Sequence, residues 1–545
     1  MGSGFVDCRR RWVDRVRQWL EPWTGRRIWA FWLVTRVALV VLAITAKVLG
    51  AQHGVLGDVR LYDQWGGGLL HGRGLPVGDD RWQYPPAAAI VLVVPSVLEA
   101  ATGFPYDVGF FLLILAADAA ITAILARRSV SAARFWLVGI CALGPVSVAR
   151  FDMVPAVLAV VAVAGLGGPA APGLTASGPA ASGPAASGPN QHSGGRWGRV
   201  GLAVGLGTAV KVWPVLLLLA LGGPGSGIRW AGRLRGPLHG RLRRCSGGRS
   251  GRPAVSLAHA ALVRMAAGLV GAVALVAVVL FVAGWWRDAF GFLGAQKDRG
   301  LQVEAVSATP FVLAHMVGLH AGPSYAWGAL QFGSKLAQLV ATICSFVEVV
   351  VVLAAAARWW LPRWSRSLEG SRAAAESRAA IHPADRMLAL LLVVLVTSRV
   401  LSPQYLVWVL AVAACRPHSS GQTVAVAARC VVDRRRRVTI GLLVTCLLSL
   451  VVYPIRYEDV IQGRVVASLL LVVRNGLLLI VCWEAVRAAW PSSRSVPWQP
   501  WRSWRRQRSG PQQRPGSHLR ADASASEASR SGPTTPTTSH TASPK

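Results

Sequence analysis

Two aspartates, an arginine and two aromatic residues occur in "GDVRLYDQW" at 57–65, directly after the first long apolar run of the chain. A carboxylate can act as a general base when it lies within hydrogen-bond reach of the proton that it removes. Because the preceding run is long enough to cross a membrane, these side chains are expected at the membrane interface. The segment is the first candidate for chemistry, with Asp58 and Asp63 as its carboxylates.

Other polar segments also stand at the ends of apolar runs. They are "ARFD" at 149–152, "KVWP" at 211–214, "DRGLQVEA" at 298–305, "TSRVLSPQY" at 397–405 and "YPIRYED" at 453–459. Ionisable groups at membrane depth are costly, so carboxylates and cations repeated at helix ends favour a binding site over a solvated rim. A polar, anionic substrate delivered from the lipid would suit such a site. The simpler alternative is that outer loops avoid net positive charge.

Composition decides the class of protein. The chain has 545 residues, 53% hydrophobic and only 15% charged, yet its formal net charge is +34. Soluble proteins carry about 25% charged residues. The arginines lie between apolar runs rather than on one compact basic domain, which argues against nucleic acid and for cytoplasmic loops held inside by positive charge.

The apolar pattern predicts an all-α polytopic protein with about twelve transmembrane helices. A long first outer loop, 51–105, should carry a surface helix at 84–100, and a second outer loop, 284–334, another at 308–320. The expected spans are 28–50, 106–126, 132–148, 153–168, 257–283, 335–357, 438–454 and 464–488, with broken pairs at 199–210/213–224 and 387–401/404–414.

Charge and low complexity give the domain organisation. A basic cytoplasmic N-terminus (1–27) precedes the transmembrane domain (28–488), which contains a flexible Gly/Ser/Pro cytoplasmic insert (169–197). The tail, 489–545, is expected to be disordered and cytoplasmic. The arginine run 433–437 is expected in a cytoplasmic loop. This topology places eleven acidic residues outside: Asp58, Asp63, Asp79, Asp80, Asp107, Asp152, Asp288, Asp298, Glu304, Glu458 and Asp459.

Four polar residues fall inside expected spans. Arg36 and Asp118 are predicted to form a structural pair, and Arg474–Asn475 should also have partners, because an unpaired charge in the bilayer centre costs a few kcal/mol or more. An antiporter would use such residues as proton or ion carriers. That reading keeps a transporter or lipid flippase as the alternative function.

Several motifs carry a resemblance to a known family. "GDVRLYDQWGGGLLHGRGLPVGDDRWQYPPAAAIVLVVP" at 57–95 resembles the opening of polyprenol-phosphate-sugar-dependent glycosyltransferases of the GT-C fold, in particular glycosyltransferase family 87, an actinobacterial α-mannosyltransferase-like group. "GPVSVARFDMVPA", "KVWPVLLLLA", "RGLQVEAV" and "SPQYLVWVL" look like later family blocks in the same order, although Ala305 replaces an expected small polar residue.

The resemblance implies an enzyme of the cell membrane with its active site facing outside. Its donor would be a polyprenyl-phosphate-linked sugar, usually mannose although relatives use arabinofuranose, and its acceptor a cell-envelope glycolipid or glycan. Transfer would proceed with inversion. The family's motif aspartate maps onto Asp58 as the base, with Asp63 as its rival.

Other residues of the matching blocks receive supporting roles. Arg60 and Tyr62 would orient Asp58 or the acceptor, and Tyr84 would shape the surface helix. The candidates for acceptor or sugar binding are Arg60, Tyr62, Asp63, Asp152, Gln404 and Tyr405, and those for the donor phosphate are Lys211, Arg299 and Arg399. Guanidinium groups pair with phosphate oxygens in bidentate fashion, and lysine supplies a point charge.

No cofactor or metal is required by this chemistry, because cationic side chains can stabilise a monophosphate leaving group. A metal bound by Asp58 and Asp152 is the alternative.

Two other functions compete. A transporter or flippase predicts internal repeats relating two halves, which the motifs lack. A non-catalytic scaffold for cell-envelope assembly would need no indispensable carboxylate.

Overall fold

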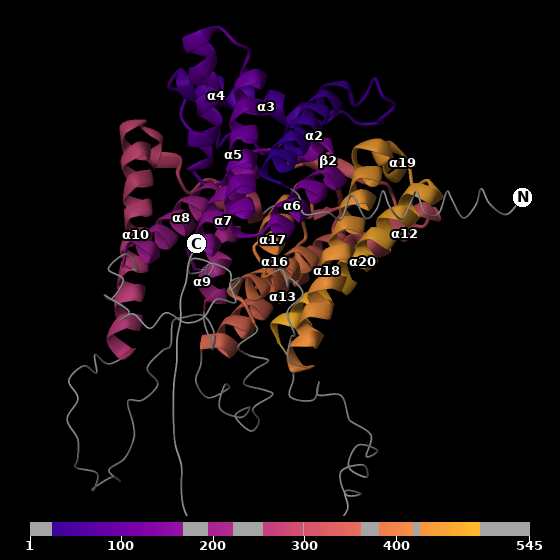
Figure 1. The fold of residues 1–545 in the computed structure, drawn as a ribbon. Helices are drawn as coiled ribbons and strands as arrows, with labels where there is room; N and C mark the ends of the chain where they lie inside the picture. Colours follow the sequence, from indigo (N-terminus) through magenta and orange to yellow (C-terminus); the bar gives the residue numbers. More distant parts are fainter. Residues whose placement is uncertain are drawn as a thin grey trace, which may run out of the picture. The chain divides into compact units, whose positions relative to one another are not determined.

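The structure, a computed structural model, describes residues 24–166, 194–221, 254–297, 299–360, 381–417 and 426–490. Helices dominate these residues (Figure 1). Most of the N-terminus, most of the Gly/Ser/Pro insert, Asp298 and the tail from 491 lie outside the described residues.

Six helices are long and apolar enough to cross a membrane. They are α2 (Gly25–Thr45), α5 (Tyr106–Arg128), α10 (Ala254–Val282), α13 (Lys335–Trp360), α18 (Val426–Leu450) and α20 (Val465–Ala489). Each has about the length that a hydrocarbon core requires. This is the architecture of a helical membrane protein.

Shorter helices fill the space between the long ones. They are α3 (Gly57–Leu70), α4 (Ala88–Thr102), α6 (Val130–Leu143), α7 (Met153–Leu166), α8 (Gly194–Val210), α9 (Leu216–Ala220), α11 (Phe292–Lys297), α12 (Thr309–Met316), α16 (Pro383–Thr397), α17 (Tyr405–Ala414) and α19 (Tyr457–Ile461). A helix is present at each position where a surface helix was expected, α4 and α12. Both broken pairs are also present, α8 with α9 and α16 with α17. Six helices are long and apolar enough to cross a membrane, whereas twelve transmembrane helices were expected. The other expected spans would have to be formed by these shorter helices.

The structure corrects three boundaries or elements. Residues 194–197, assigned to the flexible insert, begin α8. The arginine run 433–437 lies inside α18 rather than in a loop, because arginine favours helix and Arg434, Arg435 and Arg437 have acidic partners on neighbouring segments. The second outer loop also forms a small antiparallel sheet of order β1-β3-β2, built from β1 (Leu301–Gln302), β2 (Ser324–Ala326) and β3 (Ala329–Phe332).

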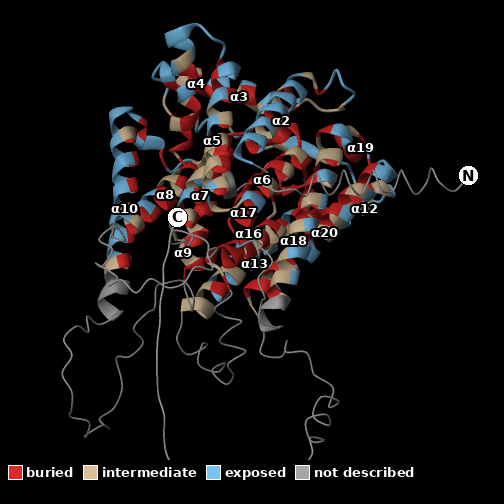
Figure 2. Ribbon diagram, in the orientation of Figure 1, coloured by how far each residue is buried: buried red, intermediate tan, exposed pale blue. Residues whose placement is uncertain are grey.

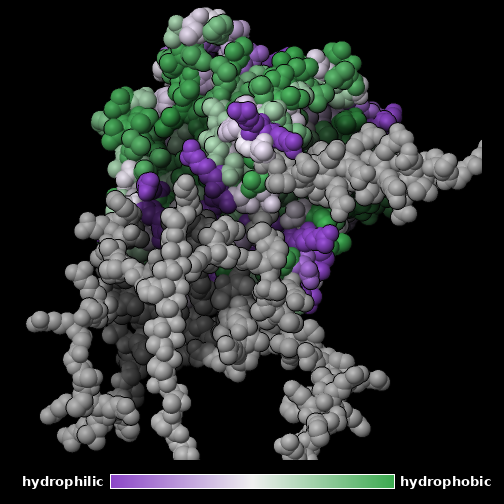
Figure 3. Space-filling model, in the orientation of Figure 1, coloured by the Kyte–Doolittle hydropathy of each residue, from purple (hydrophilic) through white to green (hydrophobic). Residues whose placement is uncertain are grey.

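The core lies where the short helices meet. Every residue of α17 from Leu406 to Ala414 is buried, against α6, α7 and α16. In Figure 2 the buried residues gather in α16 and α17, whereas much of α10 is exposed. The exposed residues of α10 and α13 are mostly valine, leucine and phenylalanine, as on a lipid-facing surface. The surface in Figure 3 is correspondingly hydrophobic over wide areas.

A buried ion pair joins the first two long helices. Arg36 Nε of α2 lies 2.7 Å from Asp118 Oδ2 of α5, and both side chains are 1% exposed. Trp32 and Trp136 each donate an indole N–H to the same carboxylate. The predicted pair is therefore present, and its carboxylate is fully occupied by donors, as a structural pair should be.

We expect Asp118→Asn to lower the free energy of unfolding by about 3–5 kcal/mol, because it leaves the buried guanidinium of Arg36 without a counter-charge. Thermal unfolding in detergent measures the loss. Asp107→Asn, an exposed carboxylate at the start of the same helix, is the matched control. Equal stability of the two variants would contradict the structural role.

Candidate functional site

Asp58 lies at the start of α3, next to a buried arginine. The inward face of α3 is formed by Val59, Tyr62, Trp65 and Leu69, at the spacing of one helix face. Asp58 stands beside this face with a side chain that is 40% exposed, and its Oδ2 is 2.5 Å from Nε of Arg150.

Arg150 comes from the turn before α7 and is held by the backbone. Its Nη1 donates to the carbonyl oxygens of Val55 and Ala149, each at 2.8 Å. Burial is the largest single effect and opposes the charge of this guanidinium, but Asp58 together with the neighbouring tyrosines outweighs it and raises the pKa of Arg150. The arginine is therefore a fixed cation beside a half-exposed carboxylate.

A second ion pair lies two residues along the chain from Arg150. Oδ1 of Asp152 accepts from Nζ of Lys211 at 2.6 Å and from the indole N–H of Trp408 at 2.5 Å. The Asp152 side chain is only 1% exposed, and that of Lys211 12%. Lys211 sits at the break between α8 and α9, just before the short 3-10 turn at Trp213–Val215.

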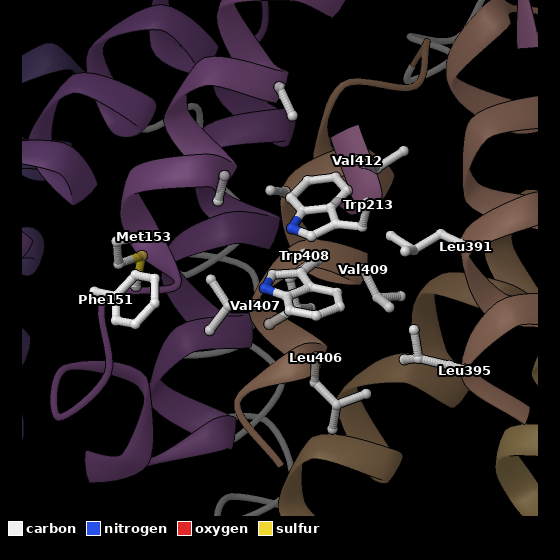
Figure 4. Close-up of a cluster of buried hydrophobic side chains, with 14 of the residues drawn as sticks. Phe151, Met153, Trp213, Leu391, Leu395, Leu406, Val407, Trp408, Val409 and Val412 are labelled. Atoms are coloured by element: carbon white, nitrogen blue, oxygen red, sulfur yellow. The ribbon is translucent and has the colours of Figure 1, made fainter. Parts of the chain in front are cut away.

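Aromatic rings surround the Lys211 ammonium. Its Nζ lies 4.8 Å from the ring centroid of Phe151, 5.0 Å from that of Trp408, and 5.5 Å from those of Tyr84 and Tyr405. Rings at this range attract a cation through their quadrupoles. Trp408 in turn stacks on Trp213 and on Tyr405, with ring centroids 5.4 Å and 4.2 Å away. Figure 4 shows Trp213 and Trp408 side by side, with Phe151 across from them.

Two tyrosines connect the ion pairs. The hydroxyl oxygens of Tyr62 and Tyr84 are 3.5 Å apart, and both rings pack edge-on against Phe151. Burial above all, and then nearby negative charge that includes Asp58, raises the pKa of both phenols. Both therefore remain protonated donors at neutral pH. We call Asp58, Arg150, Tyr62, Tyr84, Phe151, Asp152, Lys211, Tyr405 and Trp408 the carboxylate–lysine cluster.

Asp63 and Arg60 stand apart from this cluster. Asp63 has its pKa raised, first by partial burial and then by Glu99 and Asp107, so it faces the junction of α4 and α5. Arg60 is exposed, and in the described part of the chain no hydrogen bond or ion pair joins it to Asp58. The separation of Asp58 and Asp63 agrees with their five-residue spacing on a helix.

The remaining basic candidates lie along a seam between β1 and the linker that joins α16 to α17. Arg399 Nη1 donates to the Arg299 carbonyl oxygen at 3.0 Å, and the Arg399 carbonyl accepts from the Gln302 amide at 3.0 Å. The contacts of Arg299 and Arg399 therefore connect the segment around β1 to the linker between α16 and α17. Gln404 precedes the first residue of α17, and Tyr405, that first residue, reaches Lys211.

The polar segments named from sequence do converge. Asp58–Arg150 joins "GDVRLYDQW" to "ARFD", and Asp152–Lys211 joins "ARFD" to "KVWP". From "YPIRYED", Tyr453 donates to the Gly54 carbonyl and Asp459 accepts from Gln52. Interface loops far apart in the chain therefore form one connected surface.

Among the described residues, no three His, Cys, Asp or Glu side chains come together as ligands would. Asp58 and Asp152, the alternative metal pair, each have a cationic partner instead.

Sequence reasoning missed several members of the cluster. Arg150, Phe151 and Trp408 stand inside quoted motifs but received no role, and Tyr84 was assigned only to shape a helix. The one signal available was position: Arg150, Phe151 and Trp408 each lie within three residues of Asp152 or Tyr405. Sequence spacing alone does not show that these motifs come together.

Glu304 forms a further buried pair, with Arg474 of α20. Its Oε2 lies 2.9 Å from Arg474 Nη2, and both side chains are 2% exposed. Asn475 donates to the Thr309 hydroxyl at 2.9 Å, so both polar residues of α20 have the partners expected. Burial raises the pKa of Glu304 to about 7, against the opposing effect of Arg474.

A raised carboxyl pKa makes folding stability depend on pH. The contribution of Glu304 to the free energy of unfolding is fully present below its ordinary pKa of 4.5, and it is lost as the pH rises through about 7. We expect the free energy of unfolding to fall by about 1–3 kcal/mol over that window in the wild type, and the fall to disappear in Glu304→Gln. Thermal unfolding in detergent at a series of pH values measures it. Glu458→Gln, a half-exposed carboxylate, is the control, and a slope unchanged in Glu304→Gln would contradict the assignment.

Comparisons with protein-family models, curated proteins and solved structures find no match for this chain. The geometry of the carboxylate–lysine cluster, together with the quoted motifs, carries the functional argument.

Proposed function

We propose that this chain is a membrane glycosyltransferase, which moves a sugar such as mannose from a polyprenyl-phosphate donor to a glycolipid or glycan acceptor. The observation that carries the proposal is the half-exposed carboxylate of Asp58, held beside the buried cation Arg150 and within electrostatic reach of Tyr84, whose ring packs against Lys211. Sugar transfer needs a base and a cationic environment for a leaving phosphate in one place. The resemblance supplies the donor class.

Accessibility favours Asp58 as the base. Its side chain is 40% exposed, whereas that of Asp152 is 1% exposed and one of its oxygens already accepts from Lys211 and Trp408. An acceptor hydroxyl could approach Asp58 without first breaking a buried pair. Asp152 is better placed to hold Lys211 and Trp408 in position than to bind the acceptor itself.

The proposed step is a single displacement. The acceptor hydroxyl oxygen attacks the anomeric carbon while Asp58 takes its proton, and the bond from that carbon to the phosphate oxygen breaks. The electron pair leaves with the polyprenyl phosphate, whose developing charge is met by cations. Lys211 is proposed to meet that charge, because Arg150, the cation nearest the base, already pairs with Asp58. Arg299 and Arg399 remain proposed contacts of the phosphate. One displacement inverts the anomeric configuration.

A membrane location suits a donor that is mostly lipid. Six helices can span a bilayer, and the cluster is built at helix ends and breaks rather than at mid-helix. The proposed orientation puts the cluster on the outer face and both termini in the cytoplasm, following the basic loops. It can be checked by labelling single cysteines introduced at Asp80 and Glu484, which would lie on opposite faces.

Asp58→Asn should lower sugar transfer by about a hundredfold or more, because the loss of a general base typically costs 10²–10⁴ in rate. Membranes that contain equal amounts of each variant are supplied with labelled mannosyl phosphoryl polyprenol and native lipid acceptors. Asp63→Asn changes a carboxylate of the same helix that faces Glu99 and Asp107, and it should retain activity within about twofold.

The possible results separate the competing functions. Equal activity of wild type and Asp58→Asn would remove Asp58 from the role of base and leave Asp152 as the next carboxylate to change. No transfer by wild type with mannosyl or arabinosyl donors would contradict the enzyme proposal. Movement of the labelled lipid across the bilayer without sugar transfer would then support the transporter or flippase alternative.

A further inference from the structure

A second candidate binding surface lies on the opposite part of α8, between α8 and α10. It is a groove of about 610 Å³, lined by Gly195, Gly198, Arg199, Leu202, Arg264, Ala267, Gly268 and Gly271. Arg199 precedes Lys211 by twelve residues, which is about 18 Å along a helix axis. The groove is therefore separate from the carboxylate–lysine cluster.

Close packing of the two helices shapes this groove. A Cβ atom at Gly268 would lie 2.1 Å from the Gly198 carbonyl oxygen, and one at Gly201 would lie 2.0 Å from that of Met265. Only glycine permits backbones to approach so closely, as at other small-residue contacts between membrane helices. Gly195 and Gly271 differ, because a Cβ atom at either would meet nothing within 4 Å. Their missing side chains leave the groove open.

The lining combines two cations with apolar surface. Arg199 and Arg264 are exposed, and neither has an ion-pair partner among the described residues. None of the lining residues is acidic. Along α10, Val263, Val270 and Val273 next to the groove are 53–67% exposed. In Figure 3 the surface on the α10 side is largely hydrophobic, with hydrophilic side chains below it.

We propose that this groove binds an anionic diacyl phospholipid. The phosphate would lie between the Arg199 and Arg264 guanidinium groups, and an acyl chain would follow Leu202, Ala267 and the exposed valines of α10. Basic pockets between transmembrane helices recognise anionic headgroups in this way, and guanidinium groups suit phosphate oxygens. An anionic lipid is the expected occupant because the lining is positively charged and continues into the lipid-facing surface. This inference does not depend on the proposed glycosyltransferase activity.

The direct test measures lipid retention by the full-length protein. Purified protein in detergent is titrated with phosphatidylglycerol or phosphatidylcholine, and bound lipid is counted by native mass spectrometry. Arg199→Gln/Arg264→Gln should weaken phosphatidylglycerol binding about thirtyfold, equivalent to about 1 kcal/mol for each arginine. Arg26→Gln/Arg127→Gln removes the same charge from two exposed arginines elsewhere and should leave binding unchanged.

A second variant tests the groove without changing charge. Gly271→Leu should fill the open space, weaken phosphatidylglycerol binding by about tenfold or more, and preserve folding, because its Cβ meets no atom and leucine favours helix. Gly476→Leu is the matched control, an exposed glycine of α20 that also has open space around it.

Each outcome bears on the proposal. Selective retention of phosphatidylglycerol by wild type and both controls, lost in both groove variants with unchanged thermal unfolding, supports it. Equal retention by the groove variants overturns it, as does equal binding of phosphatidylcholine. Displacement of phosphatidylglycerol by inorganic phosphate alone would also overturn it, since a lipid held by its chains should remain bound.

Discussion

Moving a charged side chain out of water is costly unless it gains an opposite charge or hydrogen-bond partners. Among the described residues, Arg36–Asp118 and Glu304–Arg474 are buried on both sides, and Asp152–Lys211 and Asp385–Arg435 join a buried carboxylate to a partly buried cation. Each of these pairs joins segments distant in the chain. In a membrane protein, apolar contact between helices adds little to what lipid already provides. Charge pairing therefore does much to decide which helices are neighbours and in what register.

The same constraint accounts for the location of the carboxylate–lysine cluster. Its members come from helix starts, turns and breaks, where backbone polar groups are available and side chains can gather from several directions. Pro214 marks the break after Lys211, and the α16–α17 linker delivers Tyr405 and Trp408 to the same place. Broken helices in a membrane are tolerated where protein surrounds the break, and both of these pairs bring side chains of the carboxylate–lysine cluster together at their breaks.

The carboxylate–lysine cluster and the α8–α10 groove differ in how their cations are held. Asp152 and the aromatic rings hold Lys211 in a dry, rigid setting, whereas Arg199 and Arg264 remain exposed and unpaired among the described residues.

The sequence by itself determined the class of protein and most of its long helices. The ends of α5 and α20 fall within a few residues of their expected positions, because a run of about twenty apolar residues matches the thickness of the hydrocarbon core. Arg36 with Asp118 was also predictable, since a bilayer leaves each charge little choice of partner. Three-dimensional packing alone decided that Asp58 meets Arg150, that four aromatic rings enclose Lys211, and that strands of two to four residues form a sheet. These contacts depend on the rotation and register of helices far apart in the chain, which local apolar periodicity does not encode.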